Sequence, residues 1–172
     1  MYKRQALGLD ADRIAVAGDS AGANLALALA IDQRDRGGRM PSGAALIYGC
    51  FAPGLDSDSY QRFGQGEYGL TSARMAWYWD QYLGAARDAP PCLAAPLTCD
   101  LGGLPPIFLG IAEADPVADD SRLLHDKLVA AGVESELVEW PGTVHGFLQM
   151  TRDVAVAREA VDEIAGALSR WT

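Results

Sequence analysis

A serine flanked by glycines stands directly between an apolar segment and a helical one. Residues Arg13–Ala17 read as a short strand, Gly18-Asp19-Ser20-Ala21-Gly22 follows, and a helix is expected over Ala21–Arg36. In this context a Gly-x-Ser-x-Gly pattern predicts a sharp strand-to-helix turn that projects the serine hydroxyl from a sheet. We expect a glycine on each side of Ser20 because larger residues would collide with the neighbouring strand and helix. The backbone N–H of Ala21 would open the helix, where it can donate to a developing oxyanion.

Apolar and helical segments then alternate along the rest of the chain. Such alternation predicts an α/β fold, a mainly parallel sheet of about four strands with flanking helices, in one domain spanning residues 1–172. Residues 51–91 differ in composition and are interpreted as an insertion between strand units, with a short aromatic helix over Ser72–Leu83. The tail of a helix is expected over Met1–Leu9. The other expected strands are Gly43–Gly49, Pro105–Ala112 and Glu136–Trp140, and the other expected helices are Ala118–Ala131 and about Arg152–Trp171.

Ser20, Asp115 and His145 each come shortly after one of the expected strands. A serine hydroxyl needs an adjacent base to act as a nucleophile at neutral pH. Of the two histidines, His125 lies inside an expected helix, whereas His145 lies in a loop after the last strand. We therefore predict that His145 is the base and that Asp115 orients it, with Asp119 as the alternative acid. The order Ser, Asp, His along the chain is typical of α/β hydrolases.

Composition excludes several other functions. The formal net charge of −9, without a cluster of Lys and Arg, argues against binding to nucleic acid. Two histidines in different surroundings do not predict a metal site, and no Gly-x-Gly-x-x-Gly or P-loop indicates a nucleotide cofactor. Neither a signal peptide nor an apolar run of membrane-spanning length is apparent, so a cytoplasmic location is expected. The three cysteines, Cys50, Cys92 and Cys99, are expected to be small buried residues without a disulfide framework.

Several motifs together resemble the hormone-sensitive-lipase-like family of α/β-hydrolase esterases. They are Gly18-Asp19-Ser20-Ala21-Gly22 with Asn24-Leu25, Leu104-Pro105-Pro106, Asp115-Pro116-Val117-Ala118-Asp119-Asp120, Ala130-Ala131-Gly132-Val133 and Pro141-Gly142-Thr143-Val144-His145-Gly146-Phe147. The resemblance implies that Ser20, Asp115 and His145 are a catalytic triad that hydrolyses short-chain acyl esters through an acyl-enzyme. It extends only to the C-terminal part of the family, because the N-terminal cap and the His-Gly-Gly-Gly segment have no counterpart here.

Two further expectations follow from this partial resemblance. Without the N-terminal strands, Arg13–Ala17 would be an edge strand open to pairing, which predicts a homo-oligomer such as a dimer. Without the His-Gly-Gly-Gly donors, activity would be impaired. The alternative function is therefore a weakly active or non-catalytic fragment that serves assembly or partner binding.

Aromatic residues near the expected strand ends suggest a substrate pocket. Tyr48, Phe51, Trp77 and Phe147, together with Trp79, are candidates to line an acyl or alcohol pocket. Packing of the same rings in the core of the fold is the other interpretation, and the sequence does not choose between them.

Overall fold

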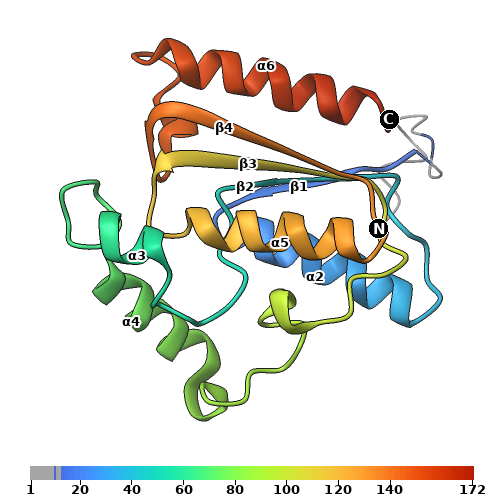
Figure 1. The fold of residues 1–172 in the computed structure, drawn as a ribbon. Helices are drawn as coiled ribbons and strands as arrows, with labels where there is room; N and C mark the ends of the chain where they lie inside the picture. Colours follow the sequence, from blue (N-terminus) through green and yellow to red (C-terminus); the bar gives the residue numbers. More distant parts are fainter. Residues whose placement is uncertain (1–9, 11–12) are drawn as a thin grey trace.

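Four parallel strands form the centre of the fold. The computed structural model describes residue 10 and residues 13–172, so the helix expected over Met1–Leu9 lies outside the described residues. The strands are adjacent in the order β1-β2-β3-β4, and every pair is parallel. This arrangement confirms the predicted α/β class (Figure 1). The strand bounds are β1 (Val16–Asp19), β2 (Ala44–Ile47), β3 (Ile107–Ala114) and β4 (Ser135–Val144).

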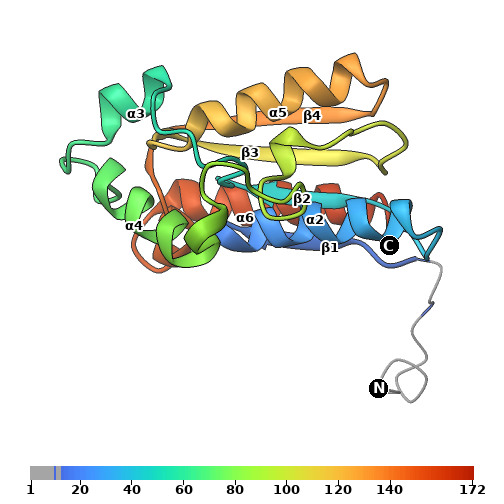
Figure 2. The same cartoon turned by 90° about the horizontal axis from the view of Figure 1, so that it is seen from below.

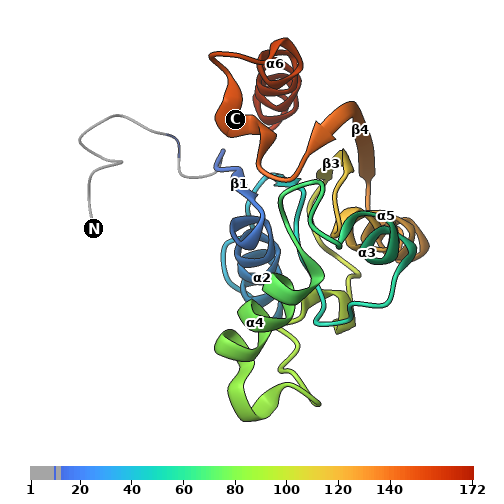
Figure 3. The same cartoon turned by 90° about the vertical axis from the view of Figure 1, so that its left-hand side faces the viewer.

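Helices cover both faces of this sheet. One face carries α2 (Ala21–Asp35) and α5 (Ala118–Ala130), and the opposite face carries α6 (Ala155–Ser169) (Figures 1 and 3). Successive side chains of a strand point to opposite faces. In β2, Leu46 therefore packs with α2 and α5, whereas its neighbour Ile47 packs with α6. Burial on both faces explains why the strands read as continuous apolar runs.

The segment between β2 and β3 carries two helices, α3 (Asp58–Phe63) and α4 (Ser72–Leu83). Both lie beyond the carboxyl ends of the strands, on the side where α5 begins (Figures 1 and 2). The hydroxyl of Thr71 accepts a hydrogen bond from the backbone N–H of Arg74 at 3.0 Å, which satisfies one of the unpaired donors at the start of α4. The segment continues through two short 3-10 turns, Gly84–Ala86 and Pro96–Thr98.

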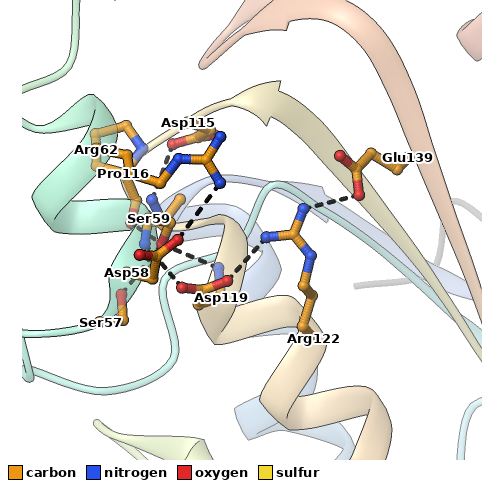
Figure 4. Close-up of polar contacts among 10 residues, drawn as sticks. Ser57, Asp58, Ser59, Arg62, Asp115, Pro116, Asp119, Arg122 and Glu139 are labelled. Carbon is orange, nitrogen blue, oxygen red and sulfur yellow. Dashed lines mark hydrogen bonds and ion pairs between the residues drawn. The ribbon is translucent and has the colours of Figure 1, made fainter.

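A polar network anchors α3 to α5 and to the sheet (Figure 4). The carboxylate of Asp119 accepts hydrogen bonds from the backbone N–H of Ser59 and from Arg122, each at 2.8 Å. Arg122 also forms an ion pair of 2.7 Å with Glu139 of β4. Partial burial on its own would raise the pKa of Asp119, but the hydrogen bonds from Ser59 and Arg122 lower it below its usual value. Asp119 therefore stays ionised and holds the start of α3 against the first turn of α5.

The last strand is longer than the sequence indicated. Pro141 to His145 was expected to be a loop, but β4 continues through Pro141 to Val144. The pairing with β3 is irregular at this point, because Ala112 is opposite Trp140 while Ala114 is opposite Val144. A proline is tolerated here because Pro141 lies in the irregular stretch between these paired residues, where its missing N–H removes no ladder bond.

The other edge of the sheet is β1. Among the described residues it pairs only with β2, as expected for an edge strand. The assembly expected through this edge stays a prediction. Within the part of the chain that the structure describes, no helix has both the length and the apolar character needed to cross a membrane.

The expectation that all three cysteines are unpaired is wrong. Cys92 and Cys99 form a disulfide, with their Cα atoms 5.2 Å apart, and only Cys50 is a free, buried thiol. Cys92 is exposed rather than buried. The bridge closes a short loop that contains the second 3-10 turn. Inside this loop, the carbonyl oxygen of Ala94 accepts a hydrogen bond from Asn24 of α2 at 3.2 Å.

Removal of this disulfide is expected to destabilise the fold. A double Cys92→Ala/Cys99→Ala variant should have a free energy of unfolding lower by about 2–3 kcal/mol, because the unfolded chain regains the entropy that the short closed loop had removed. Urea unfolding with and without dithiothreitol measures this effect. Reductant should destabilise the native chain and leave the double variant unchanged. Equal stability of all four samples would contradict the prediction.

Candidate active site

Ser20 occupies the turn between β1 and α2 in a conformation that a non-glycine residue rarely adopts. Its φ is +53°, and its backbone N–H donates to the carbonyl oxygen of Ile47 at 2.9 Å. Ser20 is the N-cap residue of α2, yet its hydroxyl makes no capping hydrogen bond. The hydroxyl instead lies 2.9 Å from Nε2 of His145. Strained backbone of this kind persists where the surrounding structure enforces it, often at a functional site.

His145 connects this hydroxyl to a buried carboxylate. Its Nδ1 lies 2.7 Å from Oδ2 of Asp115, whose side chain has 0% exposure. An ionised carboxylate only accepts hydrogen bonds, so the proton of the neutral imidazole is on Nδ1 and the lone pair of Nε2 faces Ser20. The second oxygen of Asp115 accepts from the backbone N–H of Val117 at 3.0 Å. Both carboxylate oxygens are therefore fixed, and the structure brings the three predicted residues into one hydrogen-bonded chain.

The loop that carries His145 is held by residues that sequence reasoning missed. The carboxylate of Glu113 accepts from the backbone N–H of Gly142 at 2.6 Å. The hydroxyl of Thr143 donates to the carbonyl oxygen of Trp140 at 2.6 Å. Gly146, directly after His145, has φ of +79°, which favours glycine. These contacts turn the chain sharply at the end of β4 and direct His145 toward Ser20.

The alternative candidates lie elsewhere. His125 is on α5, inside a helix as expected, and its Nδ1 contacts the hydroxyl of Ser135 at 2.9 Å. Asp119 is engaged with Ser59 and Arg122 rather than with the imidazole. The geometry therefore favours Asp115 over Asp119 as the partner of His145.

Asp120 is a second buried carboxylate close to the site. It accepts hydrogen bonds from the backbone N–H groups of Phe51 at 2.7 Å and Ala52 at 3.3 Å, which holds the chain after β2 against the start of α5. Burial raises the pKa of Asp120 to about 7, and the nearby negative charge of Asp115 adds to this effect. Sequence reasoning gave Asp120 no such role.

Ser20 and His145 open onto a cavity of about 760 Å³. Ala21, whose backbone N–H is at the start of α2, also lines this cavity, as its expected oxyanion role requires. The rest of the wall is mostly apolar and includes Leu25, Leu70, Met75, Trp79, Tyr82 and Met150. Among the described residues, no group of three or more His, Cys, Asp and Glu side chains is placed to hold a metal ion.

Of the five aromatic residues proposed as pocket walls, four do not line this cavity. Phe51, Tyr48 and Phe147 are buried in the core beneath the site, and Trp77 points outward with 57% exposure. The core interpretation is therefore correct for three of them. Trp79 does belong to the wall and has 3% exposure. On α4, Met75 and Trp79 are four residues apart and share a face, whereas Trp77 is on the opposite one.

A family model described as the α/β hydrolase fold matches residues 1–149. The chain therefore belongs to the α/β-hydrolase-fold family, which confirms the family indicated by its motifs. Carboxylesterase NlhH of Mycobacterium tuberculosis is 37% identical over 167 residues, covering 95% of this chain and 52% of the relative. The acetyl esterase of Salmonella paratyphi A is 39% identical over 159 residues, covering 90% of this chain and 49% of the relative. The chain thus spans about half the length of these curated relatives.

Solved structures of esterases have the same fold. EstE1, a thermostable carboxylesterase cloned from a metagenomic library, superposes with a TM-score of 0.93 and 39% identity, covering 99% of this chain and 59% of EstE1. The esterase of the archaeon Pyrobaculum calidifontis has a TM-score of 0.90 and 39% identity, covering 95% of this chain and 54% of that enzyme.

Proposed function

We propose that this chain is a serine carboxylesterase that acts on short-chain acyl esters. The observation that carries the proposal is the hydrogen-bonded chain from Ser20 through His145 to Asp115, with 2.9 Å and 2.7 Å between the paired atoms. The names of the relatives, a carboxylesterase and an acetyl esterase, support the same reaction and a small acyl group. The apolar wall of the adjoining cavity suits the carbon skeleton of an ester.

In the proposed reaction His145 acts first as a base. Nε2 takes the proton of the Ser20 hydroxyl while Oγ attacks the ester carbonyl, and the resulting oxyanion accepts a hydrogen bond from the N–H of Ala21. Collapse of this intermediate breaks the bond to the alcohol oxygen, which leaves with the proton from His145. Water then attacks the acyl-enzyme carbonyl while giving a proton to Nε2. Collapse of this second intermediate breaks the bond to Oγ of Ser20, which takes the proton back from His145, and the carboxylic acid leaves. Asp115 stays ionised throughout and stabilises the imidazolium.

Turnover by this chain alone is proposed to be slow. Ala21 supplies the single oxyanion donor that we assign among the described residues. Removal of one such donor typically lowers kcat about 10²–10³-fold. An esterase with only this donor would still form an acyl-enzyme, so covalent labelling is a more sensitive test than turnover.

A fluorophosphonate probe and a series of p-nitrophenyl esters test the proposal. The native chain should be labelled on Ser20 and should hydrolyse acetyl and butyryl esters faster than long-chain esters. Ser20→Ala should lose the label and lower kcat about 10⁵–10⁶-fold, because the nucleophile is gone. Ser57→Ala is a matched control, since the hydroxyl of Ser57, at the start of α3, forms a hydrogen bond with the hydroxyl of Ser59 rather than with His145. A native chain that takes no label would instead favour the non-catalytic alternative.

A further inference from the structure

Tyr48 shares an unusual backbone conformation with Ser20. They are the two non-glycine residues with positive φ among the described residues, +36° at Tyr48 and +53° at Ser20. Tyr48 directly follows β2, and Ser20 directly follows the adjacent strand β1. The backbone N–H of Tyr48 donates to the carbonyl oxygen of Gly110 at 2.7 Å, which keeps the residue in register beyond the end of β2. A left-handed conformation is costly for a bulky side chain, so its persistence here calls for a function.

This conformation places the phenol ring beneath the imidazole. The ring centroids of Tyr48 and His145 are 5.0 Å apart, with an interplanar angle of 58°. The same phenol ring packs against Phe147 at 5.9 Å. Tyr48 therefore supports both side chains of the short loop that presents the base. With 1% exposure, it has little freedom to move.

The hydroxyl of Tyr48 reaches the other half of the site. It donates to the carboxylate of Asp19 at 3.2 Å, and Asp19 directly precedes Ser20. Burial, with the nearby charge of Asp19, raises the pKa of Tyr48 well above its ordinary value. The phenol therefore stays protonated and remains a donor throughout the working pH range. One side chain thus contacts the nucleophile turn through its oxygen and the base through its ring.

We propose that Tyr48 is a positioning residue that sets the orientation of the His145 ring relative to Ser20. This inference rests on the proposed function. Tyr48 takes no proton and touches no reacting atom of the substrate. Its ring blocks rotation of the imidazole away from the line between Ser20 and Asp115, and its hydrogen bond to Asp19 holds the ring in place. A displacement of about 1 Å of a catalytic group from its reacting partner lowers the rate about 10²-fold.

Kinetics of three variants test the inference. Tyr48→Leu, which removes the aromatic ring, should lower kcat about 10–100-fold and change KM less than threefold. Tyr48→Phe restores the ring and should recover most of that loss, leaving a deficit of about 2–10-fold from the missing hydrogen bond. The matched control is Phe108→Leu, because Phe108 is buried in the same cluster and packs against Trp140 rather than His145. It should lose comparable stability while retaining kcat.

The hydrogen bond to Asp19 is tested separately. Asp19→Ala should cost about as much in kcat as Tyr48→Phe, and the double variant should cost no more than either single change, because both remove the same contact. Additive losses would show that the two side chains act independently, and would overturn the coupling between the nucleophile turn and Tyr48.

A spectroscopic readout keeps the inference separate from the proposed function. The proton between Nδ1 of His145 and Asp115 should give a far-downfield ¹H resonance in the native chain and in Ser20→Ala. The resonance should shift or broaden in Tyr48→Leu and persist in Tyr48→Phe and Phe108→Leu. An unchanged resonance in Tyr48→Leu, or an equal loss of kcat in Tyr48→Leu and Phe108→Leu, would overturn the inference. Absence of fluorophosphonate labelling in the native chain would overturn the proposed function, while this resonance would still report on Tyr48.

Discussion

Replacement of Asp115 by asparagine is expected to lower kcat about 10⁴-fold with little change in the fold. The reason lies in the two contacts of the carboxylate. The oxygen that accepts from the backbone N–H of Val117 would be kept as the amide oxygen. The amide nitrogen would then face Nδ1 of His145, where the carboxylate now accepts at 2.7 Å. Two donors cannot face each other, so the imidazole proton would move to Nε2, which could no longer accept the proton of Ser20.

Asp119→Asn is the matched control for this prediction. It removes the same charge four residues away, from a carboxylate that contacts Ser59 and Arg122 instead of the base. Its kcat should stay within about threefold of the native value. Steady-state kinetics on p-nitrophenyl acetate, with circular dichroism to confirm folding, measure both variants. A larger loss of kcat in Asp119→Asn than in Asp115→Asn would instead assign Asp119 as the carboxylate partner of His145.

Gly18→Ala is expected to disrupt the nucleophile turn itself. A Cβ at this position would lie 2.2 Å from the carbonyl oxygen of Gly22 and 2.7 Å from the backbone nitrogen of Ala23. Both contacts are to backbone, so α2 would have to move away from β1. We expect the free energy of unfolding to fall by about 3 kcal/mol or more, a large part of the stability of a small domain. Urea unfolding and fluorophosphonate labelling measure the loss of stability and of the site.

Gly22→Ala provides the contrast. Larger residues were expected to collide with the neighbouring strand and helix on both sides of Ser20. A Cβ at Gly22 would meet no atom within 4 Å, so this expectation is wrong for Gly22. Because alanine is a better helix former than glycine, this variant should unfold with a free energy higher by about 0.4–1 kcal/mol. Destabilisation similar to that of Gly18→Ala would contradict the geometric distinction between the two glycines.

The sequence predicted the architecture because several independent patterns agreed. Apolar runs too short for helices, each followed by a helical pattern, indicated a parallel sheet with helices on both faces, and the structure has this arrangement. In such a sheet the residues after the strands gather at one edge. This topological rule predicts that Ser20, Asp115 and His145 lie close together.

The same patterns could not identify the cavity wall. Trp77 and Trp79 are the same residue type, and because they are two positions apart on a helix they face different directions. Only the packing of the helix decides which of the two faces inward. Phe147 and Tyr48 were candidates because they lie near expected strand ends, whereas their rings are buried in the hydrophobic core. The disulfide was missed for another reason. Pairing of Cys92 with Cys99 depends on the path of a loop, and cysteine spacing alone does not reveal it.

Ser20 and His145 become neighbours only when the chain folds. Ser20 and His145 are 125 residues apart in sequence, and their side chains meet only across the assembled sheet. Contacts between such distant residues form late, because a long stretch of chain must be ordered first. An incompletely folded molecule therefore lacks the contact between Ser20 and His145. Under the proposed mechanism, the rate of ester cleavage would be proportional to the fraction of molecules that have finished folding.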